Sequence, residues 1–472
     1  MTGILLMNMS KALKTYSGPP RLQDLPGEVM TIIACKIEPY EKRVLATALG
    51  ISILKLKFSS KDTLAAARNG DYNVLKWILY VPRCYVDDEV LMCQATLGGS
   101  ISIVKKLYRE TRMYIDLEKV MSASAESGQI DILEWILTKT CEKSGHIIDM
   151  ALSNGHIHIL KFLKEKDFPF RHSNSDFAAQ KGHLECMIYA FENGCPWNWH
   201  TCELAAEGGH LECLKYALEH GCTYNENVSA NAASNGHLHC LVYVHEHGFP
   251  WDFVTCSWAC KGGHLECLIY ARENGCPWDF TACSAAAHKG HLNCLMYAHE
   301  NGCPWTSTTC LWACHGGQYE CLVYAHENGC PLDSTCCLAS ATGGHLKCLI
   351  YAHNQGCPWD SMTCKDAALN GYLQCLMYAH ENGCQWDSST CASAAKGGHF
   401  ECLQYAHENG CPWDASICTL AAQGGHLECL QYAHENGCPW DCNTLKLDNC
   451  FFMVCVKYAD QSRILEYIRG LQ

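Results

Sequence analysis

Apolar and polar residues follow a helical pattern in a short block that recurs along most of the chain. In one copy, residues 255–279, the stretch 256–261 is rich in small residues and predicts a short helix. The Gly262-Gly263 pair ends it. A second helix is predicted over 264–274, because its apolar residues are spaced three and four apart. Gly275 ends this helix in a left-handed conformation. Each block therefore predicts a helix, a turn, a second helix and a loop.

Individual side chains predict how these helices begin and what they bury. Thr255 is expected to cap the first helix by accepting a bond from a free backbone N–H group, and Asp279 or Thr281 to cap the helix of the next block. Trp278 and its counterparts Trp359, Trp413 and Trp440 are predicted to be large buried plugs at the connections between blocks, not a ligand cage. The second helix is predicted to bury one broad apolar face made of Leu265, Cys267, Leu268, Tyr270 and Ala271.

A glycine, usually followed by histidine, marks the turn of each block. It recurs every 27 residues from Gly128 to Gly425, and looser copies at Gly70 and Gly99 precede it at steps of 29. We count 14 blocks. A helix pair this short cannot bury its own apolar face, so neighbouring blocks must cover one another. We therefore predict an all-α solenoid of helix-turn-helix repeats over residues 60–447.

The blocks resemble ankyrin repeats. The resemblance lies in a Thr, an Ala-Ala pair, Gly-His, a second helix and Glu-Asn-Gly, as in TCELAAEGGHLECLKYALEHG from Thr201 and ICTLAAQGGHLECLQYAHENG from Ile417. Ankyrin repeats have about 33 residues. The residues missing here are those of the β-hairpin finger, so binding through hairpin tips is not implied. The short CPWD-type connector resembles the variant in ankyrin-like proteins of giant DNA viruses of amoebae. The resemblance implies an ankyrin-like fold and a protein-interaction module.

The segment 21–58 does not fit the repeat and resembles an F-box. The residues that carry this resemblance are Leu25, Pro26, Val29, Ile33 and Ile37, a Leu-Pro pair followed by apolar positions of one helix. F-boxes bind the Skp-type adaptor of cullin ubiquitin ligases, so the resemblance implies a substrate-recruiting adaptor. The tryptophan often present late in F-boxes is absent. The alternative is that this segment only caps the first open face of the solenoid.

The two ends of the chain are expected to differ from the repeats. Residues 1–20 are predicted to be a flexible N-terminus. Residues 448–472 are predicted to be a C-terminal cap, because Phe452 stands where the next glycine would fall and charged residues supply a polar face.

Cysteine and histidine could be metal ligands, nucleophiles or structural residues. The chain has 37 cysteines, which recur at fixed positions of the repeat. We favour buried core packing over metal sites or disulfides, because paired metal-ligand spacings are not systematic and some repeats lack the histidine. The histidine after the glycine is expected to be a structural hydrogen-bonding residue. Because the same Cys and His set is copied along the chain, we predict no catalytic site, no metal and no cofactor.

Positions that vary from block to block are candidates for recognition. One such position follows the cysteine of the first helix and another lies just before the turn. They are four residues apart, so they share a helical face and should align along the concave side. Tryptophans beside them are typical binding anchors. The candidate partner-binding residues, which we call the inner stripe, are Ser257, Trp258, Lys261, His288, Leu311, Trp312, His315, Leu338, Lys365, Leu369 and Lys396. The alternative is that these positions vary only because solvent leaves them unconstrained.

Charge and composition narrow the partners and the compartment. The formal net charge of −14 argues against nonspecific nucleic-acid binding, which needs a basic surface. No apolar run is long enough for a membrane span. The N-terminus does not match a signal peptide, so we place the protein in the cytoplasm, the host cytoplasm if it is viral, with the nucleus left open. We expect a monomer that binds a target protein on the concave face, with a Skp-type adaptor as a second partner.

Overall fold

The computed structural model describes residues 60–70, 75, 87–111, 115–170, 174–195, 197, 199–225 and 227–438. These residues form 27 α-helices, and no β-strand occurs among them. The predicted segments 1–20, 21–58 and 448–472 lie outside this part of the chain, and with them the F-box-like residues Leu25, Pro26, Val29, Ile33 and Ile37.

The helices alternate between the first and the second helix of each block. The first helices are α4 (Ser60–Arg68), α6 (Asp88–Leu97), α8 (Leu117–Glu126), α10 (His146–Ser153), α12 (Asn174–Lys181), α14 (Trp199–Glu207), α16 (Asn227–Ser234), α18 (Phe253–Gly262), α20 (Phe280–Lys289), α22 (Ser307–Gly316), α24 (Ser334–Gly343), α26 (Ser361–Leu369), α28 (Ser388–Gly397) and α30 (Ser416–Gly424). The second helices are α7 (Ile101–Thr111), α9 (Ile130–Leu137), α11 (Ile157–Glu165), α13 (Leu184–Glu192), α15 (Leu211–Glu219), α17 (Leu238–Glu246), α19 (Leu265–Glu273), α21 (Leu292–Glu300), α23 (Tyr319–Glu327), α25 (Leu346–Asn354), α27 (Leu373–Glu381), α29 (Phe400–Glu408) and α31 (Leu427–Glu435). The predicted all-α solenoid of helix pairs is confirmed.

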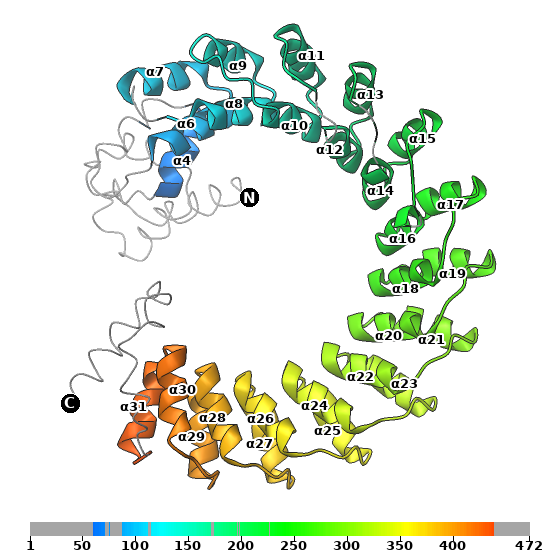
Figure 1. Ribbon diagram of the computed structural model, residues 1–472, viewed down its shortest axis with the longest axis vertical. Helices are drawn as coiled ribbons and strands as arrows, with labels where there is room; N and C mark the ends of the chain where they lie inside the picture. Colours follow the sequence, from blue (N-terminus) through cyan, green and yellow to red (C-terminus); the bar gives the residue numbers. More distant parts are fainter. Residues whose placement is uncertain are drawn as a thin grey trace, which may run out of the picture. The chain divides into compact units, whose positions relative to one another are not determined.

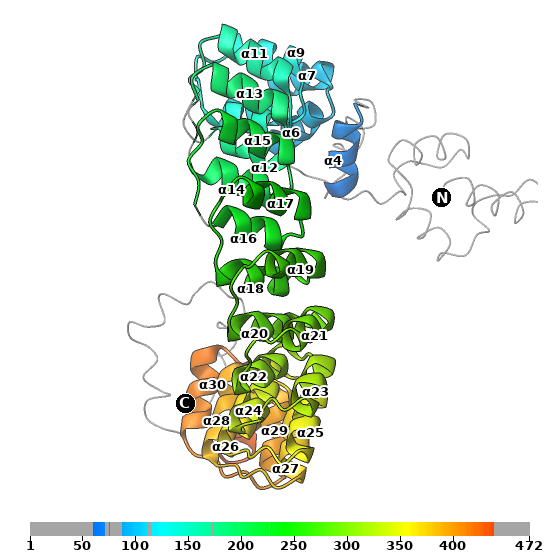
Figure 2. The same cartoon turned by 90° about the vertical axis from the view of Figure 1, so that its right-hand side faces the viewer.

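The chain divides into two compact units, and each is described by itself. The first extends to Ala205 and also takes Glu212–Thr223; the second takes Ala206–Leu211 and continues from Tyr224. In the second unit, each even-numbered helix from α16 to α30 packs against the next even-numbered helix, and it also packs on the second helix of its own repeat. We call these even-numbered helices the inner row, and we call the odd-numbered helices from α17 to α31 the outer row. Figure 1 shows the inner row on the concave side of this unit, and Figure 2 shows α16, α18 and α20 in one column beside α17, α19 and α21.

Small residues and one leucine per repeat fill the space between the rows. In the repeat of α18 and α19, the first helix buries Cys256, Ala259 and Cys260, and the second buries Leu268. Full burial of one such leucine contributes roughly 1.5–3 kcal/mol. Small side chains let successive helices approach closely. The predicted apolar face of the second helix is confirmed for Cys267, Leu268 and Ala271, whereas Leu265 and Tyr270 are only half-buried.

Aspartate, not threonine, caps the first helix of most repeats in the second unit. Asp252 accepts a hydrogen bond from the backbone N–H of Val254 at 3.0 Å, and Asp279 accepts one from Thr281 at 2.9 Å. The prediction of Asp279 is confirmed, but that of Thr255 is wrong. The helix starts at Phe253, so Thr255 lies inside its first turn, where the side chain is buried and its hydroxyl has no hydrogen-bond partner.

Glycines end both helices of the repeat as predicted. Gly263 follows α18 with φ of 77°, and Gly275 follows α19 with φ of 83°. At Gly263 a side chain is excluded for a second reason, because a Cβ atom there would overlap the ring of His291 in the next repeat. The glycine thus serves both the turn and the contact between repeats.

The histidine after the glycine bonds the preceding repeat. His237 Nε2 lies 3.0 Å from the backbone carbonyl oxygen of Glu207, and His345 Nε2 lies 3.1 Å from that of His315. Carbonyl oxygens accept, so the ring nitrogen donates. The predicted structural role of this histidine is confirmed. Because the bond goes to the main chain at the end of the first helix, the side chain at that position stays free to vary.

The described helices include none that is both long and apolar enough to cross a lipid bilayer.

Candidate protein-interaction surface

The structure brings the inner-stripe residues to one face of the second unit. Six consecutive inner-row helices, α18 to α28, carry all eleven of them. None of the eleven side chains is buried: Lys261, Trp312, His315 and Lys396 are exposed, and the other seven are half-buried. Five of them are leucines or tryptophans with at least partial solvent access: Trp258, Leu311, Trp312, Leu338 and Leu369.

Aromatic and basic side chains meet at one place on this face. The ring of Trp312 lies 5.0 Å from that of His288 and 5.5 Å from that of His315, centroid to centroid, and the two imidazoles are 5.5 Å apart. On the neighbouring helix α18, the Lys261 ammonium lies 5.8 Å from the ring centroid of Trp258. We call Trp258, Lys261, His288, Trp312 and His315 the aromatic–basic patch.

Sequence reasoning missed two exposed aromatics on the same face. Phe253 and Phe280 begin α18 and α20, and each is 43% exposed. They lie four residues before Ser257 and Ser284, the varying positions that follow the cysteine of the first helix, so each shares a helical face with that position. The signal was present in the sequence, because other repeats carry serine at this position, as at Ser307 and Ser334.

The two rows differ in charge. The inner-row helices contain four lysines and a single acidic residue, Asp366, which gives a net charge of +3 without histidine. The outer-row helices contain eleven glutamates against Arg272 and Lys347, which gives −9. Within the helices of this unit, the acidic side chains therefore lie almost entirely on the outer row.

A comparison with known proteins finds a family model that matches part of the second unit. Residues 391–434 match the family model described as ankyrin repeats in many copies. The match covers nearly all of the two helix pairs from α28 to α31. These two helix pairs are thus similar to ankyrin repeats. Such repeats generally bind protein partners and are typically non-enzymatic scaffolds.

Among solved structures, the chain is similar to an ankyrin repeat domain. The crystal structure of the human ASB11 ankyrin repeat domain matches over 33% of this chain and 84% of that chain, with 19% sequence identity and a TM-score of 0.29. A search of curated proteins finds no match.

Tryptophans of the connectors join successive repeats on the side of the outer row. Trp305 in the connector stacks on His299 at 3.7 Å between ring centroids, and the hydroxyl of Tyr324 in the next repeat lies 3.1 Å from Nδ1 of His299. Trp359, Trp386 and Trp413 stack in the same way on the histidine six residues before them. We call this arrangement the His–Trp–Tyr clamp.

The clamp corrects the prediction that the connector tryptophans are buried plugs. Trp278, Trp359 and Trp413 are half-buried, and Trp440 lies outside the described residues. At Trp278 the stacking partner is the guanidinium of Arg272, 4.5 Å from the ring centroid. The reason is geometric: the connector runs past the outer row, so the indole covers the seam between two outer helices instead of entering the space between the rows.

Nearly all of the described cysteines lie in the core as thiols. Of 32 described, 30 are buried, and none forms a disulfide. Burial raises the pKa of Cys267 and of Cys294 to about 11, so both stay protonated at neutral pH. A protonated, buried thiol is a poor nucleophile. The prediction of core packing is confirmed for these residues. Nowhere in the described ranges do three His, Cys, Asp or Glu side chains gather as a metal site would require.

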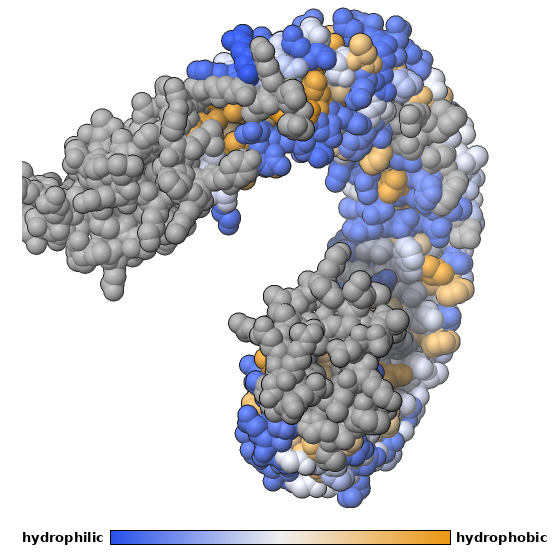
Figure 3. Space-filling view, turned by 60° about the vertical axis from the view of Figure 1, so that its left-hand side comes forward, coloured by the Kyte–Doolittle hydropathy of each residue, from blue (hydrophilic) through white to orange (hydrophobic). Residues whose placement is uncertain are grey.

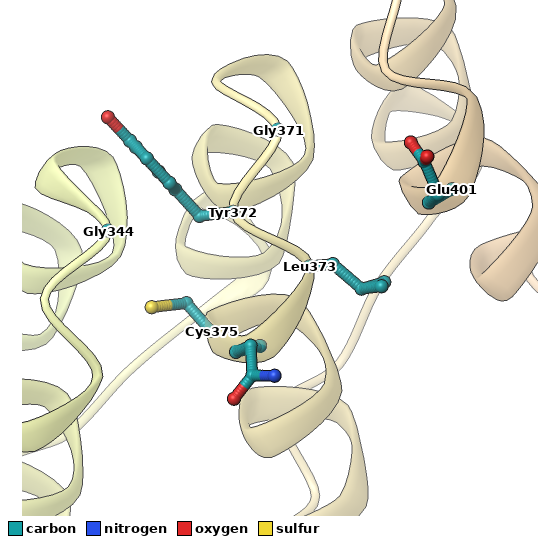
Figure 4. A pocket seen from close by; sticks show the side chains of 7 residues that line it. Gly344, Gly371, Tyr372, Leu373, Cys375 and Glu401 are labelled. Carbon is teal, nitrogen blue, oxygen red and sulfur yellow. The ribbon is translucent and has the colours of Figure 1, made fainter. Parts of the chain in front are cut away.

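An open groove of about 460 Å³ lies where one repeat departs from the pattern. Tyr372 replaces the usual histidine, and its ring lies against Gly344 of the preceding repeat. Figure 4 shows Tyr372 and Leu373 at the start of α27, with Glu401 on α29 at the far side of the groove. The groove lies at the N-terminal ends of outer-row helices, so it is separate from the inner stripe. On the face shown in Figure 3, hydrophobic residues form separate areas on a largely hydrophilic surface.

Proposed function

We propose that the chain is a protein-interaction module that binds a target protein along the inner stripe. One observation carries this proposal: side chains change from repeat to repeat at positions open to solvent on the inner row, while the buried positions beside them stay small and apolar. A surface that varies on a constant scaffold is what selective recognition requires.

Exchanges between repeats test this proposal without disturbing the fold. An inner variant carries Leu311→Ser, Leu338→Ala and Leu369→Thr, each the residue of another repeat at the same position. An outer control carries Met296→Gln and Ile350→Gln, again taken from other repeats. We expect affinity capture from native cells to retain a set of proteins on the wild type and on the outer control that is lost from the inner variant. Identical sets on all three would contradict the proposal.

We further propose that the target is recruited to a cullin-type ubiquitin ligase through segment 21–58. Support comes from the F-box-like order of Leu25-Pro26 and the apolar positions Val29, Ile33 and Ile37. Purified full-length chain should retain a purified Skp-type adaptor, and Pro26→Ala combined with Ile33→Ala should abolish this. No retention by the intact, folded chain would leave the alternative, a scaffold with no ubiquitin link.

The alternative has its own test. If residues 1–58 only cap the solenoid, their deletion should unfold or aggregate the first repeats, because their open face is then unprotected. An intact truncation with unchanged circular dichroism would count against the cap.

We propose the cytoplasm as the compartment, with the nucleus open, and a monomeric state. Support for a reducing compartment comes from the large number of free buried thiols. The likeness of the CPWD-type connectors to those of giant-virus proteins stays a prediction. Light scattering at several concentrations checks the monomer, and a mass that grows with concentration would contradict it.

A further inference from the structure

The aromatic–basic patch is unlike the rest of the inner row. Among the described inner-row helices, only α18 and α22 contain tryptophan, and His288 of the intervening α20 lies between them in the stack. Trp312 is 40% exposed although its ring contacts two imidazoles. At the same position other repeats carry Ala285 or Ser393, so folding does not require a large side chain there.

The helices that carry the patch contain only basic charged residues. Helices α16, α18, α20, α22 and α24 contain Lys261 and Lys289 but no Asp or Glu. Positive potential on a concave surface attracts anionic groups and repels basic ones. An exposed indole between imidazoles offers an apolar contact area at the same place, and tryptophan is a frequent anchor of binding energy.

We propose that the aromatic–basic patch docks an acidic segment of the target protein, one that carries carboxylates next to an apolar side chain. The apolar side chain packs on Trp312, and the carboxylates face Lys261, His288 and His315. This inference rests on the proposed function, and it specifies the chemistry of the partner and its place on the inner row.

The histidines make this docking depend on pH. Burial lowers the pKa of His288, and the positive charges of Lys289 on its own helix, His315 on α22 and Lys261 on α18 lower it further. A carboxylate bound beside the ring stabilises the protonated form and raises this pKa. Affinity must therefore rise as the pH falls from above the pKa of the complex to below that of the free protein.

Selection from a phage library of random short peptides on the full chain tests the proposal. We expect the enriched peptides to be acidic and to contain an apolar or aromatic residue. For the best synthetic peptide, Trp312→Ala should weaken binding about tenfold. Lys261→Gln, the residue of Gln423 at the same position, should weaken it about threefold at low salt and less at high salt. Lys347→Gln on the outer-row helix α25, the residue of Gln374 at the same position, removes the same charge away from the patch and is the matched control, which should change little.

The pH readout separates recognition from structure. We expect the peptide to bind about threefold to tenfold more tightly at about pH 5.5 than at about pH 7.5, and His288→Gln to reduce this ratio. Neutral or basic peptides, a lack of enrichment, or affinity unchanged by Trp312→Ala would overturn the proposal. If the patch variants leave peptide binding unchanged but Leu338→Ala and Leu369→Thr abolish it, the inner row still binds partners and only the proposal for the patch is overturned. If no inner-row variant matters, both proposals fail. A dimer of the chain that Trp312→Ala dissociates would assign the patch to a second copy.

Discussion

The inner and outer rows of the second unit are both built of short helices, but their amino-acid sequences vary between repeats to different extents. The outer helices read LNCLMYAHE in α21, LQCLMYAHE in α27 and LECLQYAHE in α31. The inner helices read FTACSAAAHK in α20, STTCLWACHG in α22 and SMTCKDAAL in α26. Both rows keep their buried cysteines and alanines, so the difference lies in the half-buried and exposed positions.

The difference follows from how each row contacts the next repeat. In the outer row, tyrosine and histidine outside the core still join neighbouring repeats, as between His407 and Tyr432, whose Nδ1 and hydroxyl oxygen are 3.0 Å apart. In the inner row, the histidine after the turn bonds a main-chain carbonyl of the preceding repeat, as between His345 and His315, and side-chain bonds between repeats include only a few of the varying residues, such as Thr342 with Asp366. Most side chains of the inner row are therefore available for recognition, whereas those of the outer row maintain the stack.

The largest expected effect on stability comes from replacing a leucine by alanine in the outer row, compared with the same replacement in the inner row of the same repeat. Leu376→Ala empties a fully buried site in α27 and should lower the free energy of unfolding by about 3 kcal/mol. Leu369→Ala on the inner stripe removes a half-buried side chain and should lower it by less than about 1 kcal/mol. Urea unfolding and hydrogen exchange of α27 and α29 measure both. Equal losses would mean that the inner stripe is part of the core.

Loss of one clamp hydroxyl should have a smaller effect. Tyr432→Phe removes the partner of His407 and should cost about 1 kcal/mol in unfolding free energy. Tyr297→Phe is the matched control, because Arg272 replaces the histidine in that clamp, and it should be nearly neutral. Thermal unfolding checks both, and a control as destabilised as Tyr432→Phe would show that the hydroxyl bond is unimportant.

The aspartate caps of the inner row should make stability sensitive to acid. Hydrogen bonds from the side chain and the backbone of Ser389 hold the pKa of Asp387 below its usual value. The folded state thus favours the carboxylate, so this contribution is complete above about pH 4, the unfolded pKa, and is lost as the pH falls through the folded pKa.

Asp387→Ala should cost about 1 kcal/mol at neutral pH, and this difference should shrink below about pH 4. Asp387→Thr should stay near the wild type at neutral pH, because Thr306 caps α22 in the same way. Urea titrations at several pH values measure the difference. A cost of Asp387→Ala that is the same at all pH values would argue that packing, not the charged cap, matters.

The smallest effect concerns the histidines that bond neighbouring repeats. Burial is the main reason that the pKa of His237 is lowered. The unfolded chain then binds a proton more readily, so stability falls as the pH drops below about 6.5. His237→Gln, the residue of Gln318 at the same position, should flatten this dependence by about one degree of melting temperature between about pH 7.5 and about pH 5.5. A wild type whose melting temperature rises over the same fall in pH would contradict the sign.

Much of the repeat was predictable because its signals are local. The spacing of Gly263 and Gly275 fixes where two helices end, since each needs a backbone conformation that other residues avoid. The inner stripe could be placed on one face because residues four apart lie on the same side of a helix. Thr255 was misjudged as a cap because threonine and aspartate give the same local signal, and the start of the helix decides between them.

The sequence by itself therefore determined the repeat length, the helix pair, the buried thiols and the exposed face of each inner helix. Only the tertiary structure decided which residues of different repeats meet. His299, Trp305 and Tyr324 form a clamp, and His288 and Trp312 form a patch, because each repeat stacks on the last with a particular offset. That offset comes from packing summed over both rows, and no single stretch of residues encodes it.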